Sequence, residues 1–174
     1  MPTDPAGLDG PADFDETFRE HYGPMVRSLA AACGDREAAD DAVQDAFTRA
    51  YTRWRRISRY DSPSGWIRHV ALNRVRDHFR KVERGRRAVD RLAARTETTV
   101  PGPEPRTDVE ALLATLSPQQ RTAAALFYVE QCSVREIADA MRLSEGAVKY
   151  HLHAARTALK GTARGTAMGV MEAP

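Results

Sequence analysis

Several polar and charged side chains near the C-terminal end of the sequence are spaced so that they could contact a nucleic acid together. They share one face of a helix predicted over residues 144–160, whose other face is apolar at steps of four, three and four. Between Arg142 and Arg164, five lysines and arginines stand against one acid, and attraction to phosphate needs this sign of charge. The outward set is Glu145, Lys149, Tyr150, His153 and Arg156, and the inward set is Val148, Leu152, Ala155 and Leu159.

A shorter helix is predicted directly before this one, so that the two would form a helix-turn-helix. Ser133 can cap the shorter helix, and Glu136 three residues later completes a capping box. The apolar stripe ends at Met141, and residues 142–144 break the pattern before Ser144 caps the next helix. A pair of helices with a basic outer face is typical of DNA binding. An ordinary helical hairpin with a solvated face would show the same pattern.

No set of residues in the sequence is typical of catalysis. There is no glycine-rich phosphate loop and no HExxH motif, and the five histidines form no recognisable ligand set. Cys33 and Cys132 belong to no CxxC or Cys/His cluster, which argues against zinc and favours a reducing cytoplasm. No apolar run approaches the roughly 18 residues of a membrane span. We therefore expect no catalytic residues, metal, cofactor or membrane insertion, and we expect that the protein is not an enzyme.

Charge is strongly segregated along the 174 residues, although the formal net charge is only +2. Residues 1–45 hold 11 acids and 3 bases, residues 49–95 hold 15 bases and 4 acids, and residues 96–174 hold 8 bases and 9 acids. Such segregation indicates separate surfaces for separate partners, with an anionic partner for the middle segment.

The elements that would carry these surfaces are predicted to be helices. Residues 14–33 form one helix or a pair, since Gly23-Pro24 marks a kink or a junction. The next helix has an apolar stripe whose members have neighbours three and four positions away, opposite a face with acids early and arginines late. Dipole-matched solvated charges would explain that face equally well. The stripe is Ala39, Ala42, Val43, Ala46, Phe47, Ala50, Tyr51 and Trp54.

The basic middle segment is predicted as a turn-rich loop followed by a long helix. Residues 55–65 form the loop, and the helix runs from Trp66 to about Arg84. Its outer face is rich in arginine and includes an amide and a carboxylate that could bond base edges. A solubilising arginine-rich helix is the alternative. The outer face comprises Arg68, Asn73, Arg74, Arg76, Asp77, Arg80, Lys81 and Arg84.

We expect an all-α protein with two small helical domains joined by a flexible linker. Residues 1–13 form a flexible arm, 14–84 the first domain, 85–108 the linker, 109–161 the second domain and 162–174 a flexible tail. Pro101, Pro103 and Pro105 exclude a helix from the second part of the linker. In the second domain, Ser117-Pro118 with Gln120 predicts a helix start.

Four strings in this order resemble bacterial RNA polymerase sigma factors of the extracytoplasmic-function group, the minimal sigma-70 type with regions 2 and 4. They are DDAVQDAFTRAYTRW at 40–54, WIRHVALNRVRDHFRK at 66–81, LSPQQRTAAALFYVEQCSVREIADAM at 116–141 and SEGAVKYHLHAARTALK at 144–160.

The resemblance implies a role for each candidate surface. The acidic helix would dock on the clamp helices of the largest subunit of core RNA polymerase through Asp41, Gln44, Asp45 and Arg49. The loop and the long helix would take up the −10 element of promoter DNA, with a base flipped from the non-template strand, through Tyr60, Asp61, Ser62, Asn73, Arg76, Asp77 and Arg80. The second helix of the helix-turn-helix would read the −35 duplex through Ser144, Glu145, Lys149, Tyr150, His153 and Arg156.

We therefore predict a cytoplasmic sigma factor, associated with the nucleoid when bound to polymerase, that starts transcription at −35/−10 promoters. An anti-sigma factor would be a further partner, as it is for many relatives. A stand-alone helix-turn-helix regulator that binds an operator directly remains the alternative. A structural helical protein with a charged surface is the third hypothesis.

Overall fold

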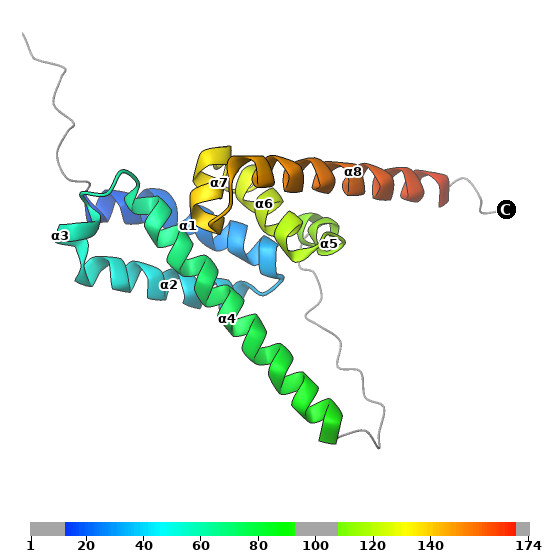
Figure 1. Cartoon of the computed structure of the whole chain (residues 1–174), viewed down its shortest axis with the longest axis horizontal. Helices are drawn as coiled ribbons and strands as arrows, with labels where there is room; N and C mark the ends of the chain where they lie inside the picture. The colour runs from blue at the N-terminus through cyan, green and yellow to red at the C-terminus, as the bar shows by residue number, and fades with distance from the viewer. Residues whose placement is uncertain (1–12, 93–107, 170–174) are drawn as a thin grey trace, which may run out of the picture.

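The computed structural model describes residues 13–92 and 108–169, and every regular element within these ranges is a helix (Figure 1). This confirms the all-α prediction. The predicted arm and most of the predicted linker lie outside the described residues. The helices are α1 (Phe14–Cys33), α2 (Arg36–Thr52), α3 (Trp54–Ile57), α4 (Pro63–Leu92), α5 (Asp108–Ala114), α6 (Pro118–Tyr128), α7 (Val134–Met141) and α8 (Glu145–Gly169).

The first helical unit consists of α1 to α4, with α1, α2 and α4 packed against one another. The apolar stripe of α2 points inward as predicted, because Ala39, Val43 and Ala46 are fully buried. Tyr51 does not follow the stripe, since 68% of it is exposed although its ring packs edge-on against Phe14. The prediction that Tyr51 is a core residue was wrong, because α2 ends one residue later and its last turn lies at the rim of the unit.

The first unit shows one helix over residues 14–33 rather than a pair, and a shorter loop than predicted before α4. Residues 14–33 form one helix that continues through Pro24, and it ends at Gly34, whose φ of 74° is left-handed. The predicted loop at residues 55–65 is shorter than expected, because α3 occupies its start and α4 begins at Pro63. The Ser62 hydroxyl accepts a hydrogen bond of 3.0 Å from the Gly65 amide and so caps α4.

Two helices extend further than the sequence indicated. α4 continues to Leu92, through eight residues that we assigned to the linker, and α8 continues to Gly169 rather than ending at Gly161. The extension of α4 consists largely of alanine, arginine and leucine, whereas the extension of α8 alternates alanine, arginine and methionine with threonine and glycine. A single glycine costs a helix only about 1 kcal/mol relative to alanine, so Gly85 and Gly161 do not end these helices.

The second helical unit consists of α5 to α8. Capping boxes begin α6 at Ser117 and Gln120 and α7 at Ser133 and Glu136, as predicted. The turn of the helix-turn-helix follows Met141, where Arg142 adopts a left-handed φ of 56°. The Ser144 hydroxyl then accepts a hydrogen bond of 3.2 Å from the Ala147 amide at the start of α8.

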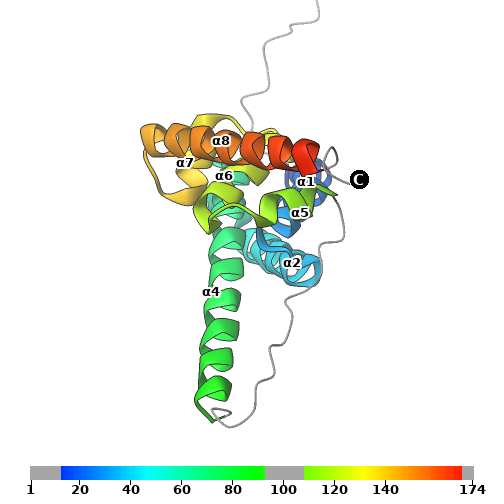
Figure 2. The same cartoon turned by 90° about the vertical axis from the view of Figure 1, so that its right-hand side faces the viewer.

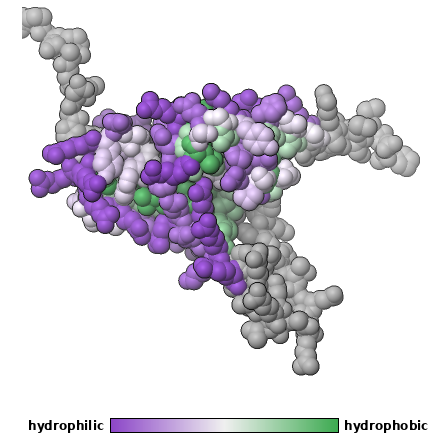
Figure 3. All heavy atoms as spheres, viewed as in Figure 1, coloured by the Kyte–Doolittle hydropathy of each residue, from purple (hydrophilic) through white to green (hydrophobic). Residues whose placement is uncertain are grey.

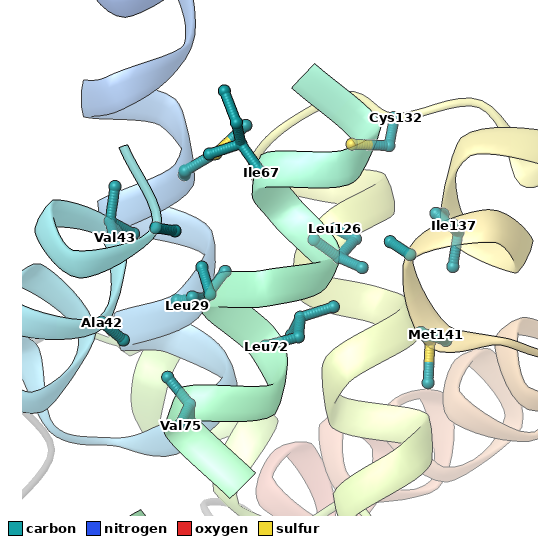
Figure 4. Close-up of a cluster of buried hydrophobic side chains, with 14 of the residues drawn as sticks. Leu29, Ala42, Val43, Ile67, Leu72, Val75, Leu126, Cys132, Ile137 and Met141 are labelled. Atoms are coloured by element: carbon teal, nitrogen blue, oxygen red, sulfur yellow. The ribbon is translucent and has the colours of Figure 1, made fainter. Parts of the chain in front are cut away.

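The two units pack directly on each other and share one apolar core. α1 lies against α5 and α6, and α4 lies against α7. Figures 1 and 2 both place the second unit beside the N-terminal half of α4, while the C-terminal half of α4 projects away. Leu29, Leu72, Leu126 and Met141, from four different helices, belong to the same buried cluster (Figure 4). The sequence did not predict this contact.

The surface is mostly hydrophilic in the view of Figure 3, with apolar residues in separate patches. None of the helices in the described residues combines the length and the apolar character that crossing a membrane would require.

Candidate polymerase and nucleic-acid interfaces

The predicted polymerase-binding face lies on α2, opposite the buried stripe. Asp41, Gln44 and Arg49 are exposed there, and Asp45 is half-buried. Neighbouring Asp40 accepts a hydrogen bond of 3.0 Å from the Tyr22 hydroxyl. Partial burial, followed by this bond and the charges of Asp40 and Asp41, raises the pKa of Tyr22. The two aspartates thus make the N-terminal half of α2 an acidic surface.

Asp45 differs from Asp41 because arginines already pair with it. Its Oδ2 atom lies 2.9 Å from Nε of Arg49, one turn later on α2, and 2.9 Å from Nε of Arg74 on α4. Asp45 therefore connects the predicted polymerase-binding face to the basic helix. Arg74 was predicted on the outer face of the basic helix, and the structure turns it toward α2.

A cleft of about 460 Å³ lies at the surface between α2 and α4, which pack against each other beneath it. It is lined by Asp41 of the predicted polymerase-binding set and by Asp77 of the predicted −10 set, together with Arg74 and Lys81. Asp77 therefore lies at the edge of the basic face that is next to the acidic helix, while Arg76 and Arg80 line a groove on the side of α6.

The loop before α4 faces the second helical unit. Tyr60, Asp61 and Ser62 line an open groove of about 1060 Å³, and α7 supplies the opposite wall with Arg135 and Asp139. Ser62 is half-buried and its hydroxyl is engaged in capping α4. Within the described structure, the predicted −10 loop thus faces α7 of the helix-turn-helix across this groove.

Asn73 is connected to the second unit through a histidine. Its Nδ2 atom donates to Nε2 of His69 at 2.9 Å, and Nδ1 of His69 donates to the Ala140 carbonyl oxygen at 2.9 Å. Arg142 approaches the same Nε2 atom with its Nε at 3.5 Å. Because Nε2 faces two donors and Nδ1 faces a carbonyl, the geometry fits a neutral histidine with its proton on Nδ1.

The remaining −10 candidates lie further along α4. Arg76 and Arg80 line a groove against α6, together with Pro118 and Thr122. Arg80 also lies 3.9 Å from Asp77, in an exposed pair one turn apart. Such exposed pairs contribute little to stability, so the Arg80 side chain can move to another partner at small cost.

The predicted −35 residues all lie exposed on the N-terminal half of α8 or at its cap. Glu145, Lys149, His153 and Arg156 follow one another at helical spacing, and Tyr150 is 67% exposed beside them. Val148, Leu152 and Ala155 are buried on the opposite face, as predicted. The structure therefore brings the −35 set together on one continuous surface.

Arg156 is held in place by aromatic side chains of α6. Its Nε atom donates to the Tyr128 hydroxyl at 2.6 Å, and its guanidinium lies 5.7 Å from the centre of the Phe127 ring. These contacts restrict the side chain before it meets any ligand, which lowers the entropy lost on binding. No local pattern in the sequence predicts this arrangement.

Arg68 is the functional residue that the sequence analysis misplaced. We predicted it on the outer basic face, but only 2% of its side chain is exposed. Its Nε and Nη2 atoms each lie 2.8 Å from Oε1 of Glu130, which is equally buried. Ser28 donates to the other carboxylate oxygen at 2.7 Å. Spacing offered a signal, because Arg68 precedes the buried residues Ala71, Leu72 and Val75 by three, four and seven positions.

Burial acts to lower the pKa of Arg68, but the charge and hydrogen bonds of Glu130 outweigh burial and the pKa is raised. The guanidinium is therefore always charged. Burial is also the main cause that raises the pKa of the nearby Cys132 thiol to about 12. The neutral thiol of Cys132 is thus enclosed beside the ion pair.

No group of three or more histidine, cysteine or acidic residues is arranged to hold a metal ion in the described parts of the chain. The surfaces described above are made of charged, amide and aromatic side chains.

Family models match both helical units. The model described as Sigma-70 region 2 matches residues 18–85, and the model described as Sigma-70, region 4 matches residues 106–159. The first range contains α2 and most of α4, and the second contains the helix-turn-helix.

Similar proteins agree with these matches. The chain is 30% identical over 153 residues to the ECF RNA polymerase sigma factor SigM of Mycobacterium tuberculosis, a match that covers 84% of this chain and 74% of that protein. It is 28% identical over 149 residues to the RNA polymerase sigma-E factor of Streptomyces antibioticus, covering 85% of this chain and 83% of that protein.

Among solved structures, the fold is similar to the sigma factor RpoE in complex with the anti-sigma factor NepR from Bartonella quintana. The TM-score is 0.68 at 21% identity, over 87% of this chain and 97% of that one. The helical units of this chain, the matching family models and the similar proteins all indicate the same family. The chain belongs to the sigma-70 family of RNA polymerase sigma factors, in the extracytoplasmic-function group.

Proposed function

We propose that this protein is a dissociable sigma subunit that binds core RNA polymerase, recognises −35 and −10 promoter elements and initiates DNA-templated transcription. The observation that carries the proposal is the presence of two basic surfaces and one acidic surface on different helices of a single sigma-70 chain. A stand-alone regulator would need only the helix-turn-helix, and region 2 would have no role in it. The sigma factor hypothesis accounts for both units.

The acidic face of α2 is the proposed docking surface for the clamp helices of the largest polymerase subunit. Asp41 and Gln44 are exposed and available for direct contacts. Asp45 and Arg49 form an ion pair that would have to rearrange or be recognised as a unit. An acidic surface also favours fast association with a basic one.

The loop before α4 and the part of α4 up to Arg80 form the proposed −10 surface. Arg76 and Arg80 would contact the phosphate backbone, and Asn73 could bond a base edge. Tyr60 lies in the loop and could stack on a base extruded from the non-template strand, which would offset the few kcal/mol that unstacking costs.

The exposed face of α8 is the proposed −35 surface. Lys149 and Arg156 supply positive charge, while Ser144, Glu145, Tyr150 and His153 surround them at the groove-facing end of the helix. A helix-turn-helix places the N-terminal part of its second helix in the major groove, and this part of α8 carries the set.

Core polymerase would supply the catalysis, and this chain would supply binding energy and specificity. Working with polymerase would place the protein in the cytoplasm, on the nucleoid when it is bound. An anti-sigma factor is the proposed negative regulator, since the similar structure of RpoE is a complex with the anti-sigma factor NepR.

Transcription in vitro with purified core polymerase and a genomic DNA library tests this function directly. We expect start sites that require this chain, preceded by two shared sequence elements at −35 and −10. Core polymerase alone is the control. Duplex binding by the chain alone, with no start site that depends on it, would support the stand-alone regulator instead.

A further inference from the structure

A buried polar cluster joins the two helical units. Arg68 of α4, Ser28 of α1 and Glu130, directly after α6, meet at distances of 2.7 to 2.8 Å. The Arg68 and Glu130 side chains are each 2% exposed, and the two residues are 62 positions apart. Among the described residues, neither side chain forms an ion pair within its own unit, so each charge has its counterion in the other unit.

Both carboxylate oxygens of Glu130 have hydrogen-bond partners, whereas one nitrogen of the Arg68 guanidinium has none in the described part of the structure. Both hydrogen bonds from Arg68 go to Oε1 of Glu130, and Oε2 accepts from Ser28. The Nη1 atom of Arg68 is buried without a hydrogen-bond partner in the described part of the structure. A cluster that leaves a guanidinium N–H unpaired gains less than a fully satisfied one, and separation into water would pair that group.

His69 provides a second connection beside the first. It bonds the carbonyl oxygen of Ala140 at the end of α7, and it occupies the Asn73 amide at the same time. The groove next to it is walled by Tyr60 and Ser62 on one side and by Arg135 and Asp139 on the other. The second unit therefore lies over Asn73 and the loop at Tyr60, whereas Asp61, Asp77 and Arg80 of the proposed −10 surface stay exposed.

The two proposed DNA surfaces are too close together to serve one promoter in this arrangement. The −35 and −10 elements lie about 25 base pairs apart, which is about 85 Å along B-form DNA. Asn73 contacts His69, and His69 is 3.5 Å from the Arg142 side chain. Ser144, the first −35 residue, is only two residues beyond Arg142, which adds at most about 8 Å. The units must separate before both elements can be bound.

We propose that the Arg68–Glu130–Ser28 cluster is a latch that holds the free protein in a closed, autoinhibited state, in which region 4 engages Asn73 and the loop at Tyr60 and keeps the two DNA surfaces too close together for one promoter. This inference rests on the proposed function as a sigma factor. Opening breaks the ion pair, returns both charges to water and releases Asn73 and the groove at Tyr60. The closed state lowers the apparent affinity for a promoter by the fraction of molecules that are open.

The acidic face of α2 stays accessible in the closed state, because Asp41 and Gln44 are exposed. Docking of α2 on polymerase therefore does not require opening, whereas promoter binding does. The latch makes polymerase contact the first step and promoter engagement the second.

The test uses variants of the full chain that alter the latch without removing its apolar surroundings. Glu130→Gln keeps the shape of the side chain and removes its charge, which leaves the Arg68 charge uncompensated only when the units are closed. Ser28→Ala removes one hydrogen bond and is the milder variant. Arg68→Met/Glu130→Leu replaces the pair by apolar side chains, which often preserve such a contact. Glu20→Gln changes an exposed acid of α1 and is the matched control.

The direct measurement is the distance between the units. A ketone-bearing phenylalanine analogue at Tyr51 and at Tyr150, both exposed, can carry nitroxide labels while both cysteines stay native. Pulsed electron paramagnetic resonance measures the distance between the two nitroxide labels. It should give one narrow distance distribution for the otherwise unchanged protein and for Glu20→Gln. Glu130→Gln should give a broad distribution at longer distances, Ser28→Ala a smaller shift in the same direction, and the apolar pair a narrow distribution again.

A broad distribution in the unchanged protein would overturn the latch, and so would a folded Glu130→Gln variant with the unchanged distribution. If Glu130→Gln loses its helical circular dichroism, Ser28→Ala decides by the same criterion. In transcription at limiting protein, Glu130→Gln should reach half-maximal output at a roughly three- to tenfold lower concentration, since more of it is open.

The two measurements separate the latch from the proposed function. Narrow distances that widen in Glu130→Gln, without transcription by any variant, would support the latch and refute the sigma function. Transcription by a protein that is already open would support the function and refute the latch.

Discussion

Arg68 and Glu130 form a buried ion pair across the junction of the two helical units, with Nη2 of Arg68 2.8 Å from Oε1 of Glu130. Burying two charges is costly, and their attraction repays that cost only when the geometry is good. A pair of this kind contributes less to stability than apolar packing would. It favours the observed arrangement of the two units, because the two charges neutralise each other there.

The strength of this pair can be measured by a double-mutant cycle on Arg68→Ala and Glu130→Ala. Each single change should lower the free energy of unfolding by up to about 3–5 kcal/mol, because the remaining charge must either stay buried without a partner or separate the two units to reach water. The double variant should lose clearly less than the sum of the two. Urea unfolding followed by circular dichroism measures all four proteins. Additive losses would show that the two side chains act independently.

Asp41→Ala/Asp45→Ala should weaken binding to core polymerase by roughly tenfold or more, as loss of two interface anchors does. Asp41 is exposed, whereas the loss of Asp45 also releases Arg49 and Arg74 from their ion pairs. Competition between labelled and unlabelled protein for core polymerase measures the affinity. Asp15→Ala/Glu16→Ala removes the same charge from an exposed turn of α1 and should bind normally. Equal affinities for all three proteins would refute the assignment of α2.

Lys149→Ala/Arg156→Ala should weaken binding to a −35 duplex and reduce its salt dependence. The slope of log K against log salt is negative, and each lost phosphate contact makes it less steep by about 0.9. The magnitude of the slope should therefore decrease by roughly 2. Fluorescence anisotropy at several salt concentrations gives the slope. Arg27→Ala/Arg36→Ala, two exposed arginines of the first unit, changes the net charge equally and should leave the slope near its original value. A similar fall in that control would assign the effect to net charge alone.

Glu136 should make the helix-turn-helix sensitive to acid. Burial acts to raise the pKa of Glu136, but hydrogen bonds from the Ser133 backbone and hydroxyl, at 2.8 and 2.7 Å, outweigh burial and lower the pKa. A lowered folded pKa means that the stabilisation is fully present above the unfolded value of about 4.3 and is lost as pH falls through the folded value.

Glu136→Gln retains a side chain that can complete the capping box but removes the charge. We expect it to lose about 0.5–1 kcal/mol at pH 7. The difference from the unchanged protein should shrink as the pH falls below about 4. Urea unfolding at pH 7 and at pH 3.5 provides the comparison. A difference that is the same at both values would mean that the Glu136 carboxylate does not contribute through its charge.

Local features of the sequence were sufficient to predict the helices and their caps. Ser133 and Glu136 form the predicted capping box, and the stripe of Val148, Leu152 and Ala155 is buried, because both patterns depend only on residues within a few turns. The same reasoning placed the −35 residues on one exposed face. Helix ends do not follow from such local features, since Gly85 and Gly161 predict boundaries and α4 and α8 continue through them.

Sequence alone determined the family, the helical class and which helices carry the acidic and basic faces. Only the tertiary structure decided how those surfaces are shared between the two units. It moved Arg68 from the predicted outer face into the core, turned Asp77 toward α2 and placed the −10 loop against α7. The physical reason is that helical periodicity shows which side of a helix is apolar, but it carries no information about a counterion 62 residues away.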